Sequence, residues 1–142
     1  LLESSSDDET STVVEASGWI DVPVTYGGSE GPDLAEVARA CGLTEEEVVR
    51  RHASGDYRVC FIGFLPGFPY LGPLDASLRV PRRATPRPRV PSGSVAVAGD
   101  YTGIYPWESP GGWRLIGRTA LRLFDLARVP PALLAHHGDF LQ

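Results

Sequence analysis

Methionine, lysine and asparagine are absent from the 142 residues of this chain, and cysteine occurs only as Cys41 and Cys60. Two cysteines are too few for a disulfide scaffold or for a zinc site built from CxxC pairs. No apolar run approaches the roughly 20 residues that span a bilayer, and no basic-then-apolar signal segment opens the chain. These absences predict a cytoplasmic protein, and the missing initial methionine predicts a chain that is processed or cut from a longer one.

Charge is divided unevenly along the chain. Residues 1–50 contain 12 acidic residues and two arginines, whereas residues 51–142 contain six acidic residues and 11 arginines. The net charge of −5 argues against nucleic-acid binding. The basic second half is suited instead to a small anion or an acidic protein, so we predict neither a nucleic-acid nor a membrane partner.

The chain divides by composition into a tail and one domain. Residues 1–18 are rich in serine, threonine and acids, which is typical of a linker. We therefore predict a linker, or the remnant of a missing N-terminal domain, over residues 1–18 and a single domain over residues 19–142.

Two short helices are predicted near the start of this domain. Asp33 is a suitable N-cap for the first, and Gly42 is suited to end it. Thr44 and Glu47 form a capping box for the second, which ends near Ser54. The pair resembles a DNA-binding helix-turn-helix, but three glutamates begin the second helix and would face phosphates. We predict a structural helical hairpin.

Short β-branched runs separated by glycine and proline occupy the rest of the domain. The predicted strands include 19–25, 57–64, 94–98 and 113–116. Many short strands with Gly/Pro turns favour a barrel over a layered α/β fold. The predicted fold class is therefore mainly β, a closed or nearly closed barrel with the helical hairpin inserted near its N-terminus.

Three loops contain the candidate binding residues. Pro66 and Gly67 form a type II turn signature, and Phe68 after them either caps the core or lines a pocket. Residues 80–93 place arginines, among them Arg82 and Arg87, in a proline-stiffened segment. These arginines either bind a carboxylate or phosphate or are solvated.

The third loop places Gly111 and Gly112 before Trp113, as either an anion-binding nest or a plain tight turn. His52 closes the second predicted helix, where a basic group suits the helix dipole, or else it points into the site. No metal site is predicted, because sequence places no third defined ligand beside His136 and His137.

Four blocks carry a family resemblance: GFLPGFPYLG, PRRATPRPRVPSGSVAVAG, TGIYP and SPGGWRLIGRT. They resemble the KipI family, whose members are known as the B-type subunit of 5-oxoprolinase or as allophanate hydrolase subunit 1. The resemblance implies the cyclophilin-like barrel of the family's C-terminal domain. It also implies a role in ATP-dependent opening of the lactam of pyroglutamate to glutamate, together with an A-type subunit and a homologous, KipA-like C-type subunit. ATP would be used by the complex, with no cofactor bound by this chain.

These features together predict one side of a shared site for a small carboxylate or amide substrate. His52 or Tyr105 would transfer protons, and Arg82 or Arg87 would bind the substrate carboxylate. The chain offers no complete set of nucleophile, base and orienting group. The full predicted substrate-binding set comprises Pro66, Gly67, Phe68, Arg82, Arg87, Gly103, Gly111, Gly112, Trp113 and Arg118.

Two other interpretations stand beside this one. In the first, the same loops form a protein-docking face of a regulatory module that inhibits a histidine kinase, as one member of the KipI family does. In the second, the chain is an inactive remnant, because full-length family members carry an N-terminal α/β domain before the barrel.

Overall fold

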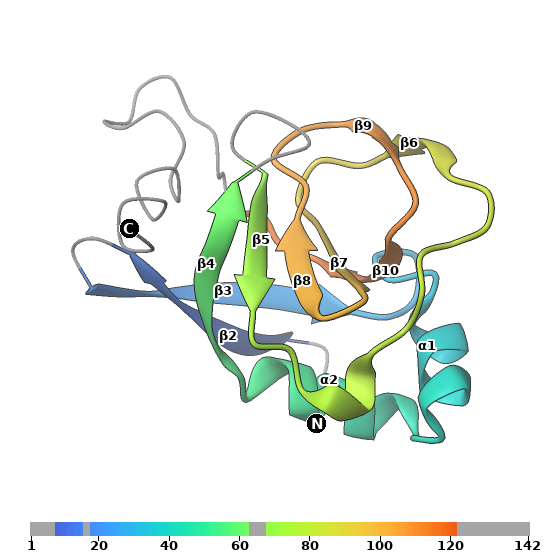
Figure 1. The fold of residues 1–142 in the computed structure, drawn as a ribbon, viewed down its shortest axis with the longest axis horizontal. Helices are drawn as coiled ribbons and strands as arrows, with labels where there is room; N and C mark the ends of the chain where they lie inside the picture. Colours follow the sequence, from blue (N-terminus) through green and yellow to red (C-terminus); the bar gives the residue numbers. More distant parts are fainter. Residues whose placement is uncertain (1–7, 16–17, 63–67, 122–142) are drawn as a thin grey trace.

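The computed structural model describes residues 8–15, 18–62 and 68–121 (Figure 1). The described chain is mainly β, as predicted, with two short α-helices and one 3₁₀ turn. None of these helices has the length and apolarity needed to cross a membrane. The elements are β2 (Asp8–Glu15), β3 (Gly18–Tyr26), α1 (Leu34–Cys41), α2 (Glu45–Ala53), β4 (Asp56–Ile62), β5 (Pro69–Gly72), η1 (Ala76–Leu78), β6 (Arg87–Val90), β7 (Ser94–Ala98), β8 (Tyr101–Ile104), β9 (Ser109–Gly111) and β10 (Arg114–Arg118).

Seven strands form one strongly curled sheet. Their hydrogen-bonded order is β10-β3-β2-β4-β5-β8-β7, and β10 also pairs with β7, so the pairings run round as a closed barrel. All neighbours are antiparallel except β2 and β4. Three junctions are short, with two residue pairs each: β10 meets β3 at Gly117 and Arg118, β2 meets β4 at Thr12 and Val13, and β5 meets β8 at Tyr70 and Leu71. The cyclophilin-like assignment itself stays a prediction.

The strand β2 lies within residues 1–18, and the division of the chain at residue 19 stays a prediction. Residues 8–15 pair with β3 along their full length, from Asp8 opposite Thr25 to Glu15 opposite Gly18. Composition alone suggested a linker because acids and serines are rare in strands. The ladder of backbone hydrogen bonds to β3 stabilises this strand despite the low strand propensity of its acidic residues.

The two helices lie where the capping residues predict them, between β3 and β4. The Thr44 side chain accepts a hydrogen bond from the Glu47 backbone N–H at 3.1 Å, and Gly42 ends α1 with a left-handed φ of 70°. Both helices lie together beneath one end of the barrel (Figure 1). Leu34, Val37 and Val48 from these helices join the main core.

The strand β7 separates two apolar cores. Val95 and Val97 belong to the main core inside the barrel, whereas Ala96 and Ala98 belong to a second cluster on the other face. Because side chains alternate across a strand, the run SVAVA is buried on both sides. The two-stranded sheet β6–β9 stands outside the barrel (Figure 1) and contributes Val90 to the second cluster.

Candidate functional site

A groove of about 340 Å³ opens beside the second core. It is formed where the arginine- and proline-rich loop after Val80 meets the turn from β9 to β10 and the strand β5. Four of the predicted binding residues, Arg82, Gly111, Gly112 and Trp113, line this groove. The other lining residues are Tyr70, Arg83, Pro86 and Pro110.

An aromatic cluster forms the base of the groove. The Phe68 ring is fully buried and lies 5.4 Å from the Trp113 ring and 5.1 Å from the Tyr105 ring, both edge to face. Gly103 faces this cluster, because a Cβ there would lie 2.9 Å from Phe68 and 3.1 Å from Trp113. Phe68 and Gly103 therefore support the groove from beneath, and of the two alternatives for Phe68 the structure favours the core.

Arg82 is the exposed cation of the groove. Its guanidinium carbon lies 6.0 Å from the centre of the Trp113 ring, in cation–π range. It forms no ion pair with a carboxylate of the described residues. Arg82 is therefore held over an aromatic face with its hydrogen-bond donors available to a ligand.

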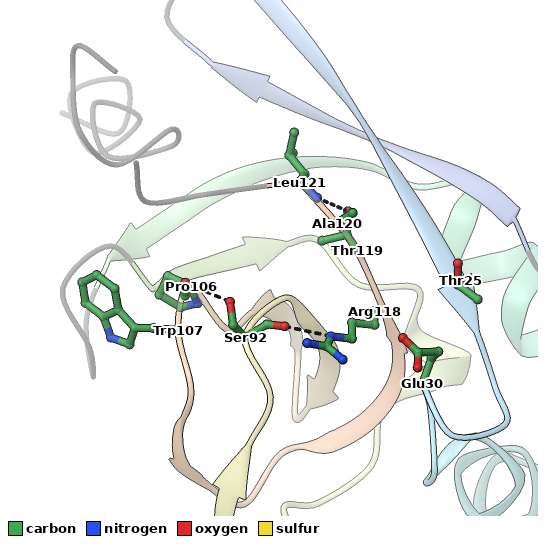
Figure 2. A pocket seen from close by; sticks show the side chains of 9 residues that line it. All are labelled: Thr25, Glu30, Ser92, Pro106, Trp107, Arg118, Thr119, Ala120 and Leu121. Atoms are coloured by element: carbon green, nitrogen blue, oxygen red, sulfur yellow. Dashed lines mark hydrogen bonds between the residues drawn. The ribbon is translucent and has the colours of Figure 1, made fainter. Parts of the chain in front are cut away.

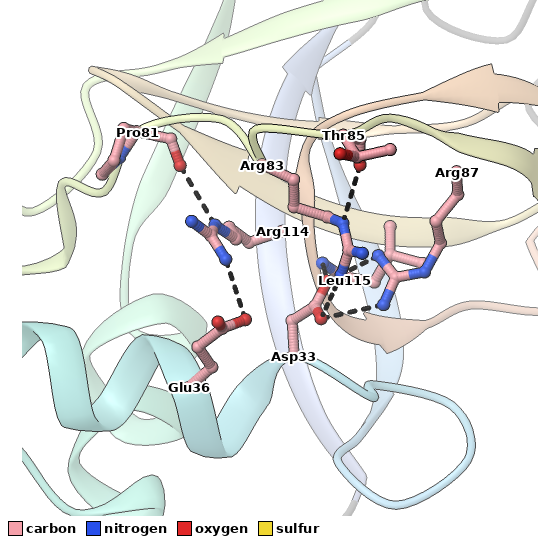
Figure 3. Close-up of polar contacts among 8 residues, drawn as sticks. All are labelled: Asp33, Glu36, Pro81, Arg83, Thr85, Arg87, Arg114 and Leu115. Atoms are coloured by element: carbon pink, nitrogen blue, oxygen red, sulfur yellow. Dashed lines mark hydrogen bonds and ion pairs between the residues drawn. The ribbon is translucent and has the colours of Figure 1, made fainter.

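Arg87 pairs with a carboxylate of the chain itself. Its two terminal nitrogens donate to the two carboxylate oxygens of Asp33 at 2.7 and 2.8 Å (Figure 3). Arg83 adds a third contact to Asp33 at 3.3 Å. The bidentate pair uses the fork that a substrate carboxylate would need, so Arg87 binds an internal carboxylate instead.

Asp33 occupies the N-cap position of α1, as predicted, but its side chain is used elsewhere. Its side chain makes no capping hydrogen bond to α1; it accepts the Leu115 backbone N–H at 2.8 Å and is buried. Burial alone would raise its pKa. The hydrogen bonds from Arg87 and Leu115 and the charges of Arg87 and Arg83 outweigh burial, so the pKa is lowered below 3.8. Asp33 is an ionised anchor for the groove loop.

Two further contacts fasten the same loop. The Arg83 backbone N–H donates to the Gly112 carbonyl at 2.7 Å. Arg114 donates to the Pro81 carbonyl at 3.1 Å and forms an ion pair with Glu36 at 2.8 Å (Figure 3). The loop is thus tied to α1, β10 and the turn that faces it across the groove.

Gly111 and Gly112 do not have the torsions of a nest. Neither is among the described glycines with positive φ, which a nest of alternating hand requires. Gly111 has a packing role instead, because a Cβ there would overlap the Tyr105 hydroxyl. Gly112 has room for a Cβ, whose nearest neighbour would be the Arg83 carbonyl oxygen at 3.7 Å, an ordinary van der Waals contact.

His52 lies inside the barrel rather than at the groove. Its Nδ1 is 2.7 Å from the Tyr26 hydroxyl, and its Nε2 is 2.9 Å from Thr102 Oγ1. Thr102 donates its own hydrogen to the Ala96 carbonyl at 2.7 Å, so Thr102 Oγ1 accepts from Nε2–H and Nδ1 accepts from Tyr26. This fixes the neutral Nε2–H tautomer. Burial lowers the pKa of His52 from 6.5 to about 4.

Tyr105, the other predicted proton-transfer residue, is fully buried beneath the groove. Burial raises its pKa, opposed by a hydrogen bond from the Trp113 backbone and the charges of Arg82 and Arg87. The structure therefore does not bring His52 and Tyr105 together at the groove.

Arg118 lies apart from the groove, in a second pocket that it shares with Ser92 and Trp107 (Figure 2). Pro66 and Gly67 lie outside the described residues. The catalytic and binding roles of all these side chains remain predictions. Among the described residues there is no group of three side chains suited to hold a metal ion.

Sequence reasoning missed the anchoring role of Asp33 and Arg83. Asp33 is 50 residues from Arg83, 54 from Arg87 and 82 from Leu115. The periodicities of helices and strands relate residues only a few positions apart, so they do not predict these contacts. The one available signal was the division of charge along the chain, which predicts that acids of the first half meet arginines of the second.

Comparisons with known proteins identify the family. A family model described as carboxyltransferase domain, subdomain C and D, matches residues 1–134. The B-type subunit of 5-oxoprolinase from Escherichia coli O157:H7 is 55% identical over 127 residues, covering 89% of this chain and 58% of that protein. The protein of the same name from Bacillus subtilis (strain 168) is 50% identical over 123 residues, covering 87% of this chain and 51% of that protein.

A solved structure agrees with the fold. The crystal structure of a conserved uncharacterized protein from Pyrococcus horikoshii superposes with a TM-score of 0.77 at 48% identity, covering 86% of this chain and 54% of that one. The chain therefore spans about half the length of the relatives it matches. The resemblance seen in the sequence blocks is confirmed: this chain belongs to the carboxyltransferase domain, subdomain C and D, family, whose members include the B-type subunit of 5-oxoprolinase.

Proposed function

We propose that this chain is part of a subunit of an ATP-dependent 5-oxoprolinase, which opens the lactam of 5-oxoproline to glutamate. The relatives named as B-type subunits of 5-oxoprolinase support the reaction class, and their designation as subunits supports the presence of partners. The proposed partners are an A-type subunit and a homologous C-type subunit.

The observation that supports this proposal best is Arg82. A 5-oxoproline carboxylate carries one negative charge, and a guanidinium presents two parallel donors to it. Of the arginines in the groove loop, Arg83 and Arg87 are engaged by Asp33, whereas Arg82 extends over Trp113 without a carboxylate partner among the described residues. Arg82 would bind the substrate carboxylate, with the Trp113 ring against the apolar part of the lactam.

The groove supplies binding groups but not the chemistry of hydrolysis. Its described lining residues include no carboxylate, histidine, cysteine or serine. The buried His52 is kept neutral within its own hydrogen bonds. The group that activates water, and the site where ATP is cleaved, would come from the partner subunits. The groove is then one half of a shared site.

The test is reconstitution with the A-type and C-type subunits, measuring ATP hydrolysis that depends on 5-oxoproline. We expect activity only when all components are present, and Arg82→Gln should raise KM for 5-oxoproline about tenfold or more, since it removes a charged contact to the substrate. Arg89→Gln removes the same charge from an exposed position of β6 and serves as the control. Activity that is unchanged when this chain is omitted would contradict the proposal.

A further inference from the structure

The second pocket has a volume of about 630 Å³ and shares no lining residue with the groove. Figure 2 shows its wall, which includes Thr25, Ser92, Pro106, Trp107, Glu30 and Arg118. The last two carry opposite charges. A pocket wall with a positive and a negative group favours a ligand that carries the complementary charges.

Arg118 is rigidly placed and only partly used by the protein. Its backbone lies in β10 between Thr25 of β3 and Ser94 of β7. Its Nε donates to the Ser92 carbonyl at 2.9 Å, and it forms no ion pair with a carboxylate of the described residues. The two terminal nitrogens of the guanidinium are therefore available, in the geometry that binds a carboxylate with two hydrogen bonds.

Glu30 is the matching acid. Its backbone N–H donates to the Gly27 carbonyl at 3.1 Å, which holds the turn before α1 in place. Its carboxylate receives one long hydrogen bond, from Ser29 at 3.4 Å, and like Arg118 it forms no ion pair within the described part of the chain. Glu30 and Arg118 both line this pocket, and Figure 2 shows Trp107 on its far side.

We propose that this pocket binds a free α-amino acid, with its carboxylate on Arg118 and its ammonium group on Glu30. A simple anion or a simple amine would pair with one of the two charges and leave the other without a partner. An amino acid satisfies both, and its side chain then extends along Pro106 and Trp107. The inference is independent of the proposed 5-oxoprolinase reaction, because it concerns different residues, although glutamate belongs to this ligand class.

Titration calorimetry on the full chain tests the proposal. The probes are glycine, L-glutamate, propionate and methylamine. We expect saturable binding of the two amino acids and at least tenfold weaker binding of propionate and methylamine, which each present one of the two charges. No saturable binding of either amino acid, or equal binding of propionate, would overturn the proposal.

Four variants locate the site. Arg118→Gln and Glu30→Gln should each weaken amino-acid binding about tenfold or more, whereas Arg89→Gln, which removes a charge from the exposed surface, should leave it unchanged. Both pocket side chains are partly exposed, so thermal unfolding midpoints should stay at the wild-type value. Binding that survives Arg118→Gln but is lost in Arg82→Gln would assign the amino acid to the groove and refute the second site.

Discussion

Asp33 joins three parts of the chain through one carboxylate. It accepts hydrogen bonds from Arg87, Arg83 and the Leu115 backbone, and its side chain is only 5% exposed. A buried carboxylate is stable as an anion only if its oxygens are paired in this way. The geometry of the groove loop therefore depends on one ionised residue that does not line the groove.

Replacing Asp33 by Asn should lower the free energy of unfolding by about 2 to 4 kcal/mol, since it leaves two arginine contacts uncompensated. Urea unfolding measures this change. The control is Glu36→Gln, which breaks the Arg114 ion pair at a side chain that is 50% exposed and should change stability by less than about 1 kcal/mol. Equal effects of the two variants would contradict the role of Asp33 as anchor.

Because the folded pKa of Asp33 lies below 3.8, its contribution to stability is present above that pH and is lost as the pH falls through the folded pKa.

The burial of neutral His52 predicts a second loss of folding stability at acidic pH. Its folded pKa is about 4 against 6.5 when unfolded, so the unfolded chain binds an extra proton between these values. Stability should therefore fall by about 3 kcal/mol as the pH is lowered from 6.5 to 4. His52→Gln should lose this component, which comparison of urea unfolding at several pH values reveals. A wild-type protein whose His52 ring titrates near pH 6.5 by NMR would refute the buried neutral assignment.

At the scale of elements, the two-stranded sheet β6–β9 has its own packing rules. Gly111 of β9 lies against the Tyr105 hydroxyl, whereas a Cβ at Gly112, one residue later, would make only ordinary van der Waals contacts at 3.7 Å or more. Two adjacent glycines in one turn thus have opposite tolerance for a side chain.

Gly111→Ala should lower the free energy of unfolding by about 1 to 3 kcal/mol, because the added methyl group displaces a buried tyrosine. Gly112→Ala should change it by less than about 0.5 kcal/mol. Thermal unfolding of the two variants side by side measures the difference. A tolerated Gly111→Ala would show that Tyr105 is not fixed against β9.

The elements themselves were largely predictable from sequence. Thr44 with Glu47 and Gly42 locates the helix boundaries, and SVAVA locates β7, because capping and β-branched patterns act over a few residues. Contacts between side chains that lie far apart in the sequence were not predictable. Arg82 and Arg87 are alike in sequence context, and only the fold brings Trp113 to the first and Asp33 to the second.

At the scale of the whole molecule, α1 is where the acidic and basic halves meet. The ion pairs of Asp33 with Arg83 and Arg87, and of Glu36 with Arg114, all cross between the halves. The other ion pairs of the described residues join neighbours in α2 or residues within the second half. Two acids of the first half, Asp33 and Glu36, are therefore neutralised by arginines of the second half at the groove loop.

Barrel closure is the second property of the whole molecule, and it depends on Gly117. A Cβ there would lie 2.7 Å from Val24 and 2.8 Å from the Thr25 carbonyl, at the short junction of β10 with β3. Gly117→Ala should push these strands apart and lower the free energy of unfolding by about 1 to 3 kcal/mol. Hydrogen exchange should then rise in β3 and β10 more than in β7 and β8. Uniform exchange across the four strands would contradict the junction as the site of opening.

Arg83 has a consequence for redesign. Both its backbone N–H and its side chain are committed to the protein, to Gly112 and Asp33, whereas Arg82, next to it, extends over Trp113. A library that varies Arg82, Pro86 and Pro110 while keeping Arg83 would alter what the groove recognises without loosening the loop that carries it. Of these two adjacent arginines, Arg83 is held by the protein, whereas Arg82 is the one proposed to contact a ligand.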